Sequence, residues 1–410
     1  MAELGFVMGG LSYTYENGVT STDPFPPSND PVIILGKKYS SVFDHKKLKK
    51  VVQTLPWFTY RKGFNPIGGT GPTSDQGWGC MLRCGQMMLC QSLVNLHLPP
   101  NWTWSIDSLG GSPAYRKVLD MFLDKKSSCY SIHQIASMGV AEGKNVGQWF
   151  GPNTVAQVLK KLTSYDDWNQ IVIHVAMDNT VVIEDIKSLC KTPHTSSGVN
   201  LQFESDTSIT TSLYRDPSLS SHLSPHTSLT SSESWDGHVW RPLLLMVPLR
   251  LGLSCINDIY MRSLKRFFEL PYTVGVLGGK PNHAHWFIGY TGDDLIFLDP
   301  HTVQPMVDTD THDGLWDDSS YHCTAACRMN ISNLDPSVAL GFFCRTEQEF
   351  DDLAQILQHE KNSIAPMFEV CLKRPTHWPP LNTGNPHGTD TVFTVVPSPK
   401  YDTDDEYELV

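Results

Sequence analysis

The spacing of apolar residues changes part way along this chain. Up to about Thr163 they recur at the three- and four-residue intervals of helices. Beyond Gln170 they gather in short β-branched runs, which are typical of strands. The expected helices are Met81 to Val94, Tyr115 to Leu123, Thr154 to Leu162, Asn257 to Glu269, and one that a Thr346–Glu349 capping box opens and that ends near His359. The expected strands are Gln170 to Ala176, Leu243 to Leu249, Thr273 to Leu277, His285 to Tyr290, Leu295 to Leu298 and Val338 to Cys344.

This order predicts an α+β fold, in which a helical half precedes a mostly antiparallel sheet half and an active site lies where they meet. The chain has 410 residues and 40% hydrophobic content, which is enough for a sizeable core. We expect a flexible lead-in over 1–30, a helical half over 31–189, a disordered Ser/Thr-rich insert over 190–238, a sheet half over 239–372 and a flexible acidic tail over 373–410.

The composition excludes several classes of function. A formal net charge of -12 argues against nucleic acid as the main partner. No stretch approaches the roughly 20 apolar residues of a membrane span, and the N-terminal residues lack the basic start of a signal peptide. We therefore expect a cytoplasmic protein whose ten cysteines are thiols.

Metal binding is not expected. Cys80 and Cys84, like Cys323 and Cys327, are spaced by four residues, whereas paired structural zinc ligands usually lie closer. Two alternating histidines, His283 and His285, fit a core or active-site strand better than a metal site. The sequence therefore predicts neither a metal nor a cofactor.

One cysteine has the surroundings of a nucleophile. Cys80 follows the bend Gly77-Trp78-Gly79 and precedes a helical run. Glycines permit a sharp turn, and the start of a helix directs N–H groups and the positive dipole end towards the sulfur, which favours the reactive thiolate. The alternative is an ordinary buried cysteine, since free cysteines are often found in cores.

A thiol nucleophile needs a base and a group that orients the base. Asp299-Pro300-His301 follows an apolar strand, and residues two apart on an extended chain face the same way. His285 is a rival base, because it lies on a strand as the base of papain-like enzymes does. Spacing alone does not choose between His285 and His301. The backbone N–H of Cys80 and the hydroxyl of Tyr60 are candidate oxyanion donors.

Several long motifs resemble one known family. They are Phe58 to Lys62, Ile67 to Asp75, Gly77 to Met87, Gly147 to Thr154, Gly278 to Pro281 and Leu298 to Thr302. In this order, over about residues 30 to 370, they resemble the autophagy cysteine endopeptidases, which process the ubiquitin-like modifiers of autophagy.

The resemblance implies a papain-like fold with a small auxiliary α/β subdomain. It implies hydrolysis after a glycine near the modifier's C-terminus and removal of phosphatidylethanolamine from that glycine. It assigns Cys80 as nucleophile, His301 as base, Asp299 as the orienting group and Tyr60 as oxyanion support. It makes Trp149 a lid over the cleft. The loop that would lift for substrate is Gly278, Gly279, Lys280 and Pro281.

The implied partners are the modifiers, both as precursors and as phosphatidylethanolamine conjugates. The resemblance also implies peripheral contact with autophagic membranes through the lipidated substrate, and a monomer. In the tail, Tyr407 and Val410 follow acidic residues in a spacing that resembles a modifier-binding motif. Cys84, one helical turn after Cys80, is either a packed residue or a redox-sensitive one. Two alternatives stay open: a catalytically idle modifier-binding protein, and a hydrolase for another ubiquitin-like modifier.

Overall fold

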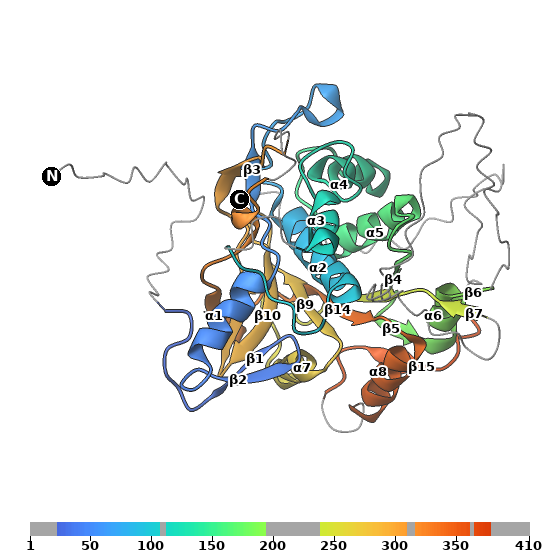
Figure 1. Cartoon of the computed structure of the whole chain (residues 1–410). Helices are drawn as coiled ribbons and strands as arrows, with labels where there is room; N and C mark the ends of the chain where they lie inside the picture. Colours follow the sequence, from blue (N-terminus) through green and yellow to red (C-terminus); the bar gives the residue numbers. More distant parts are fainter. Residues whose placement is uncertain (1–22, 107–111, 194–237, 310–315, 361–364, 379–410) are drawn as a thin grey trace, which may run out of the picture.

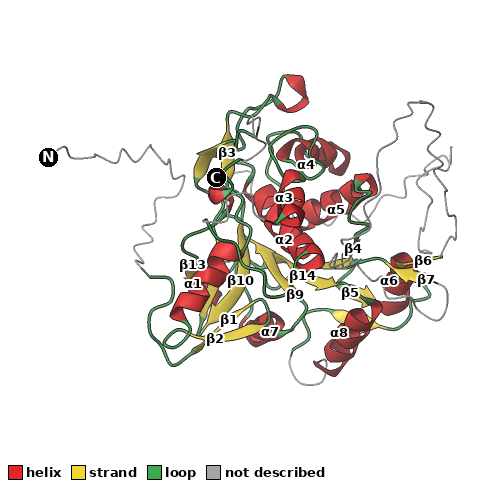
Figure 2. Ribbon diagram, viewed as in Figure 1, coloured by secondary structure: helices red, strands yellow, loops and turns green. Residues whose placement is uncertain are grey.

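A computed structural model gives the fold of residues 23–106, 112–193, 238–309, 316–360 and 365–378. Most of the predicted Ser/Thr-rich insert (residues 194–237), most of the lead-in and most of the acidic tail lie outside these residues. Figure 1 and Figure 2 show helices stacked on one side of a large sheet and a smaller group of elements at one end of it. No helix in the described segments has both the length and the apolar character needed to cross a bilayer.

The large sheet is almost entirely antiparallel. Its strand order is β13-β11-β10-β9-β14-β8-β4, and only β4 pairs in parallel, with β8. These strands are β4 (Val172–Val175), β8 (Leu243–Arg250), β9 (Thr273–Gly278), β10 (His285–Thr291), β11 (Asp294–Leu298), β13 (Cys327–Asn330) and β14 (Ser337–Cys344). The prediction of a mostly antiparallel sheet is confirmed.

Both faces of this sheet are buried, which explains its continuous apolar runs. Along β8, Leu244 and Met246 face one core, while Leu243, Leu245 and Val247 face the other. The first core holds α2 (Cys80–His97), α3 (Pro113–Asp120), α4 (Ile132–Gly139) and α5 (Pro152–Leu162), and the second holds α7 (Asp258–Glu269). The sheet therefore separates the helix layer that begins at Cys80 from α7.

The central helix is α2, and nearly all of its residues are buried. It contacts β9 and β10. The approach is close at Gly341 of β14, where a Cβ atom would lie 2.6 Å from the sulfur of Met88. A helix that is apolar all round belongs in the interior of a protein. The position of α2 therefore fixes Cys80 against the sheet.

A smaller α/β unit extends the sheet beyond β4 (Figure 1). Its helices are α6 (Ile183–Cys190) and α8 (Glu347–Glu360). Its strand pairs are the parallel β5 (Thr180–Val182) with β15 (Glu369–Cys371) and the antiparallel β6 (Lys191–Pro193) with β7 (His238–Trp240). The chain therefore has the papain-like α+β architecture with a small additional unit that the sequence predicts.

Two strands lie where the sequence predicted mostly helix. β1 (Pro31–Ile34) and β2 (Lys37–Ser40) form a hairpin, and β1 pairs with β10 of the large sheet. The turn residues Leu35 and Gly36 have φ of 42° and 78°. The β-branched run favours a strand, and the helix α1 (His45–Thr54) begins only after it. The helical part of the first half therefore starts at His45.

The other predicted elements are present. α2, α3, α5 and α7 overlap their predicted ranges, and α8 begins directly after Thr346. The Thr346 hydroxyl accepts a hydrogen bond from the backbone N–H of Glu349 at 3.2 Å. In a regular capping box the Glu349 carboxylate would accept a hydrogen bond from the backbone N–H of Thr346. Here it accepts from the backbone N–H of Arg345, one residue earlier.

Candidate active site

The bend before α2 is formed by two glycines with different tasks. Gly77 has φ of 86°, a left-handed conformation that glycine adopts without strain. Gly79 leaves room for Asp75, because a Cβ atom there would lie 2.3 Å from the Asp75 carboxylate oxygen Oδ2. The backbone N–H of Gly79 donates to the Asp75 carbonyl at 2.8 Å. This bend makes Cys80 the first residue of α2.

A buried charge network lies beneath the bend. The Arg83 guanidinium donates to the Asp75 carboxylate at 2.8 and 3.1 Å and to the Asp124 carboxylate at 2.7 Å. The side chains of Arg83 and Asp75 have no exposed surface. A second Asp75 contact comes from the backbone N–H of Arg61 at 2.7 Å. The network ties the first turn of α2 to the segment before it, and it is a support that sequence reasoning did not identify.

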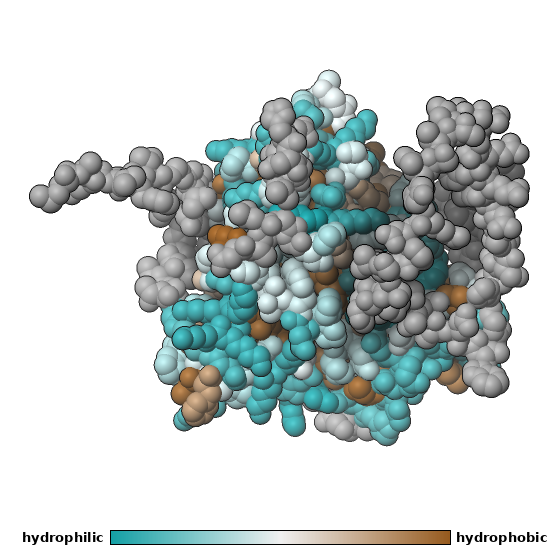
Figure 3. All heavy atoms as spheres, in the orientation of Figure 1, coloured by the Kyte–Doolittle hydropathy of each residue, from teal (hydrophilic) through white to brown (hydrophobic). Residues whose placement is uncertain are grey.

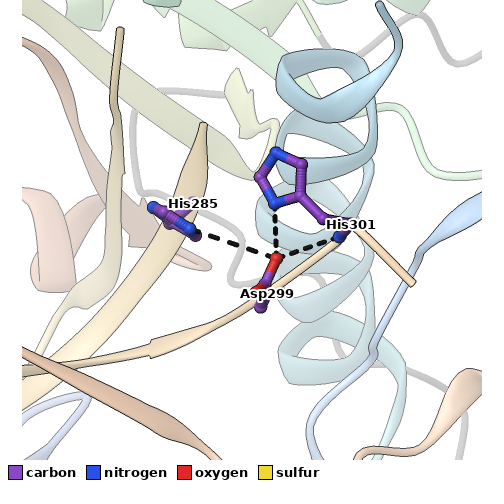
Figure 4. A group of neighbouring side chains, drawn as sticks. All are labelled: His285, Asp299 and His301. Atoms are coloured by element: carbon purple, nitrogen blue, oxygen red, sulfur yellow. Dashed lines mark hydrogen bonds and ion pairs between the residues drawn. The ribbon is translucent and has the colours of Figure 1, made fainter. Parts of the chain in front are cut away.

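An acid–histidine pair follows β11, where the predicted Asp299 and His301 lie together (Figure 4). The Nδ1 atom of His301 is 2.5 Å from Oδ1 of Asp299, and the His301 backbone N–H donates to the same oxygen at 2.9 Å. The indole N–H of Trp57 donates to the Asp299 carbonyl at 2.7 Å. The carboxylate therefore fixes the position of the imidazole ring and holds a proton on Nδ1.

The electrostatics of this pair favour an imidazolium. Burial opposes the charge on His301, but the hydrogen bonds and negative charges of Asp299 and Cys80 outweigh burial and raise the pKa of His301 to about 10. Burial acts to raise the pKa of Asp299, and its contacts with His301 and His285 reverse this and lower it. At neutral pH the pair is therefore a carboxylate and an imidazolium.

Tyr60 lies against the same imidazole. Its ring centroid is 5.5 Å from that of His301, in an edge-on arrangement. β3 (Tyr60–Lys62) pairs in parallel with β12 (Val303–Pro305), and the Tyr60 backbone N–H donates to the Pro300 carbonyl at 2.9 Å. The buried hydroxyl has no hydrogen-bond partner of normal geometry. Burial, followed by the neighbouring Cys80, raises the pKa of Tyr60.

His285 occupies the other side of Asp299 (Figure 4). Its Nε2 atom is 4.0 Å from Asp299 Oδ1, too far for a hydrogen bond. Burial lowers the pKa of His285 to about 4, despite the opposing charge of Asp299. The ligand-type atoms of His285, Asp299 and His301 lie within 4.8 Å of one another, a spacing that a metal ion could use. The His301–Asp299 hydrogen bond already occupies two of these atoms.

The predicted gate loop runs from the end of β9 to β10. Gly279 has φ of 131°, and a Cβ atom there would lie 2.2 Å from the His283 carbonyl oxygen. Lys280 and Pro281 are exposed. The His301 Nε2 atom is 2.9 Å from the Asn282 carbonyl oxygen. The loop thus contacts the imidazole through Asn282, a residue that the sequence analysis did not identify.

The remaining predicted site residues are less directly placed. Trp149 is half-buried in the segment before α5, and its indole N–H is buried without a hydrogen-bond partner. Burial, with smaller contributions from Cys80 and Asp299, raises the pKa of Cys84 well above its ordinary value, which disfavours a reactive thiolate. Tyr407 and Val410 lie outside the described residues.

This geometry can support nucleophilic catalysis by a thiol. Cys80 lies close enough to Tyr60 and His301 for its charge to shift the pKa of both groups. Acyl transfer by a thiol requires a nucleophile, a base beside it and a group that orients the base. Here the nucleophile would be at the start of a helix, and a carboxylate lies behind the base.

Comparisons with known proteins give the family. The model of the peptidase C54 catalytic domain matches residues 45–356. The chain is 47% identical to cysteine protease ATG4A of Xenopus laevis over 408 residues, covering 98% of this chain and 97% of that protein. It is 46% identical to human cysteine protease ATG4A over 413 residues, covering 97% and 98%. It is also 47% identical to cysteine protease ATG4B of Gallus gallus over 378 residues, covering 90% and 91%.

The matched region begins at α1 and ends within α8, so it contains the bend before Cys80, the acid–histidine pair and the loop beside it. The relatives match almost from end to end. The chain therefore belongs to the C54 family of cysteine peptidases.

Proposed function

We propose that Cys80 is the nucleophile of this peptidase and His301 its base. Asp299 orients the base and stabilises its protonated form. The observation that carries the proposal is the hydrogen bond between His301 and Asp299 beside a cysteine that opens a buried helix. The neutral His285, 4.0 Å from the same carboxylate, lines the site without sharing this role.

The reaction follows from this arrangement. The Cys80 thiolate attacks the carbonyl carbon of the substrate glycine, and the carbonyl electrons move onto oxygen. The Cys80 backbone N–H and the Tyr60 hydroxyl stabilise that oxyanion. His301 gives its proton to the departing amine, which leaves a thioester on Cys80. Water, deprotonated by His301, then attacks the thioester. The C–S bond breaks and releases the glycine acid, which ionises in solution, and the Cys80 thiolate is restored beside the His301 imidazolium.

The chain is a cysteine peptidase that processes the ubiquitin-like modifiers of autophagy, as its family membership indicates. The same acyl-transfer steps serve two leaving groups. A peptide amine leaves when a precursor is cleaved after its glycine, and the amine of phosphatidylethanolamine leaves when a lipid conjugate is hydrolysed. One active site therefore accounts for both priming and delipidation.

Access to the thiol requires movement. Cys80 has no exposed surface, and the Asn282 carbonyl holds the Nε2 atom of His301. Lifting the loop Gly278 to Pro281, together with Asn282, frees the imidazole. Trp149 then covers a substrate glycine from the other side of the cleft, and only a residue without a side chain passes beneath it.

The acidic tail supplies a second contact with the modifier. Tyr407 and Val410 insert into two pockets of the modifier while the backbone adds a strand to its sheet edge. Linkage to the catalytic part raises the local concentration of substrate. Replacing both residues by alanine should raise KM for a folded modifier without lowering kcat. An unchanged KM would remove the tail from the mechanism.

The cellular setting follows from the substrate. The enzyme acts in the cytoplasm as a monomer and touches autophagic membranes peripherally, through lipid-linked modifiers. An idle modifier-binding protein would not need the paired Asp299 and His301. A hydrolase for another ubiquitin-like protein would need the pair, but the family match favours the autophagic modifiers as substrates.

The test is a timed cleavage assay on a panel of autophagic modifiers and of other ubiquitin-like proteins with C-terminal extensions. We expect the wild type to cleave autophagic modifiers after the glycine, and Cys80→Ala to cleave none. Cleavage by Cys80→Ala would refute the role of the thiol. Preference for a different ubiquitin-like protein would support the alternative hydrolase.

A further inference from the structure

An apolar tip projects between β2 and α1. The side chains of Val42 and Phe43 are 52% and 90% exposed, and Phe43 is the most exposed large apolar side chain in the described residues. Figure 3 shows a brown projection at the lower left, where these elements lie in Figure 1. A single exposed apolar residue is common on soluble proteins, but Val42 and Phe43 are adjacent and form one small exposed apolar patch, which can mark an interaction site.

The tip is a built turn. The Ser40 hydroxyl accepts hydrogen bonds from the backbone N–H groups of Val42 and Phe43 at 3.3 and 3.2 Å. The Asp44 carboxylate accepts from the Ser40 backbone N–H at 2.9 Å. These bonds fix the backbone on both sides of Phe43, so the ring is held away from the protein core.

Lysines surround the tip. Within a chain of net charge -12, residues 37 to 50 carry six lysines: Lys37, Lys38, Lys46, Lys47, Lys49 and Lys50. None of the six forms an ion pair with an acidic group of the described residues. Two acids near this segment make other contacts: the Asp44 carboxylate accepts from Ser40, and Asp23 pairs with His45 at 2.8 Å, although the charge of Lys49 also acts on Asp23.

The same face contains a cavity of about 490 Å³ between β1, β2, α1 and the end of α2. Its charged lining residues are Lys37, Lys47, Lys50 and Arg345, and no acidic side chain lines it. Two buried polar atoms of the lining have no hydrogen-bond partner: the acceptor Oε1 of Gln91 and the donor Nε of Arg345. Gln91 is 7% exposed.

The unpaired atoms indicate what the cavity would bind. Cationic lysines and a guanidinium suit phosphate. The Gln91 amide nitrogen donates to the Asn95 side-chain oxygen at 2.8 Å, whereas no protein donor reaches the Gln91 oxygen. A buried acceptor left without a partner is costly, so a ligand that supplies both phosphate oxygens and a hydroxyl donor fits the cavity. An inositol phosphate headgroup has both.

We propose that this basic face, defined as Val42, Phe43, the six lysines and the adjoining cavity, docks the enzyme on an anionic bilayer. The Phe43 ring enters the interfacial region, and the headgroup of an inositol phospholipid occupies the cavity. Basic residues near an anionic surface and an aromatic anchor act together in peripheral membrane binding. The inference adds a direct membrane contact to the proposed delipidation reaction and does not depend on its chemistry.

The test is flotation of the full chain, without substrate, with vesicles. Neutral phosphatidylcholine vesicles are compared with vesicles that also hold about 5 mol% phosphatidylinositol 4-phosphate. We expect binding only to the acidic vesicles at ~0.1 M salt, and its loss when salt shortens the screening length. Phe43→Ser and the pair Lys47→Glu/Lys50→Glu should each lower the bound fraction about tenfold.

Two matched controls separate this surface from general effects. Leu253 is 85% exposed, so Leu253→Ser removes a comparable apolar side chain elsewhere. Lys125→Glu/Lys126→Glu makes the same change of charge outside the face. Both should bind vesicles as the wild type does. Equal binding to neutral and acidic vesicles, or wild-type binding by the Phe43 and Lys47/Lys50 variants, would overturn the proposal.

Two further readouts keep the result unambiguous. Cleavage of a soluble precursor by each variant should equal that of the wild type, which shows that the variants fold and that membrane docking is separate from catalysis. If Lys47→Glu/Lys50→Glu does not fold, Lys47→Gln/Lys50→Gln replaces it. Soluble inositol trisphosphate should displace the enzyme from vesicles. Binding of that compound without any vesicle binding would contradict a bilayer as the occupant.

Discussion

The charge state of His301 depends on one neighbouring carboxylate. Asp299 stabilises the imidazolium, and the pKa of His301 is raised to about 10. A thiolate–imidazolium pair needs a protonated His301, so activity should fall as pH rises through that value. In Asp299→Asn the charge that raises the pKa is lost, and the alkaline limb of kcat/KM should shift to lower pH. Measuring kcat/KM against pH for both proteins checks this, and an unmoved limb would contradict it.

Two histidines flank Asp299, and their replacement should have unequal effects. His301→Gln removes the proposed base, and we expect kcat to fall by about 10³-fold or more. His285→Gln removes a neutral ring that makes no hydrogen bond to Asp299, and we expect a change of less than about tenfold. Single-turnover cleavage rates for the two variants show which histidine acts as the base. A larger loss for His285→Gln would reverse the assignment of the base.

The sequence pointed to Cys80, Asp299 and His301 but left His285 as an alternative. The reason is physical. Either histidine could face the carboxylate from its position near a strand, and the choice depends on distances of 2.5 and 4.0 Å. Those distances are set by contacts such as Trp57 to Asp299, which joins residues 242 apart in the chain. Local spacing does not encode such a contact, and only the family resemblance resolved it beforehand.

Among the elements, the first turn of α2 depends on the buried guanidinium of Arg83. In Arg83→Met the carboxylates of Asp75 and Asp124 stay buried without their cation. Leaving a buried charge unpaired costs about 3–5 kcal/mol, so the free energy of unfolding should fall by that amount. Urea unfolding measures the loss.

A matched variant on another helix serves as the control. Arg262 of α7 is exposed, so Arg262→Met should change the free energy of unfolding by less than about 0.5 kcal/mol. If Arg83→Met were equally mild, the network would not be the support of the bend, and the position of Cys80 would have to rest on Gly77 and Gly79 alone.

Long periodic elements and short, continuously apolar strands were predictable, whereas the short strands β1 and β2 were not. α2 and β14 are long and mostly apolar, and both were predicted from the sequence. β1 and β2 have four residues each, and the second contains two lysines, so their pattern does not distinguish a strand from a loop. Their pairing with the large sheet is decided by β10, more than 240 residues further along. Tertiary contacts determine such edge strands.

At the scale of the whole molecule, the active site joins the helix layer to the sheet. Cys80 comes from the start of α2, Asp299 and His301 follow β11, and Tyr60 belongs to β3. The pairing of β3 with β12 brings these parts together. In the proposed mechanism, catalysis depends on the packing of α2 against the sheet, and two covering segments, one before α5 and one after β9, control entry to the thiol.

These covering segments should restrict the residue before the scissile bond to glycine. A Cβ atom on that residue would meet the proposed Trp149 lid, and a displacement of about 1 Å at the reacting carbon can cost ~10²-fold in rate. A modifier with alanine in place of its glycine should therefore be cleaved at least about 10²-fold more slowly by the wild type. In Trp149→Ala the difference between the two substrates should shrink, because the obstructing ring is gone. Measuring kcat/KM for both substrates with both enzymes separates specificity from a general loss of activity. Equal discrimination by wild type and Trp149→Ala would mean that Trp149 is not the lid, and that the loop around Gly279 alone excludes larger residues.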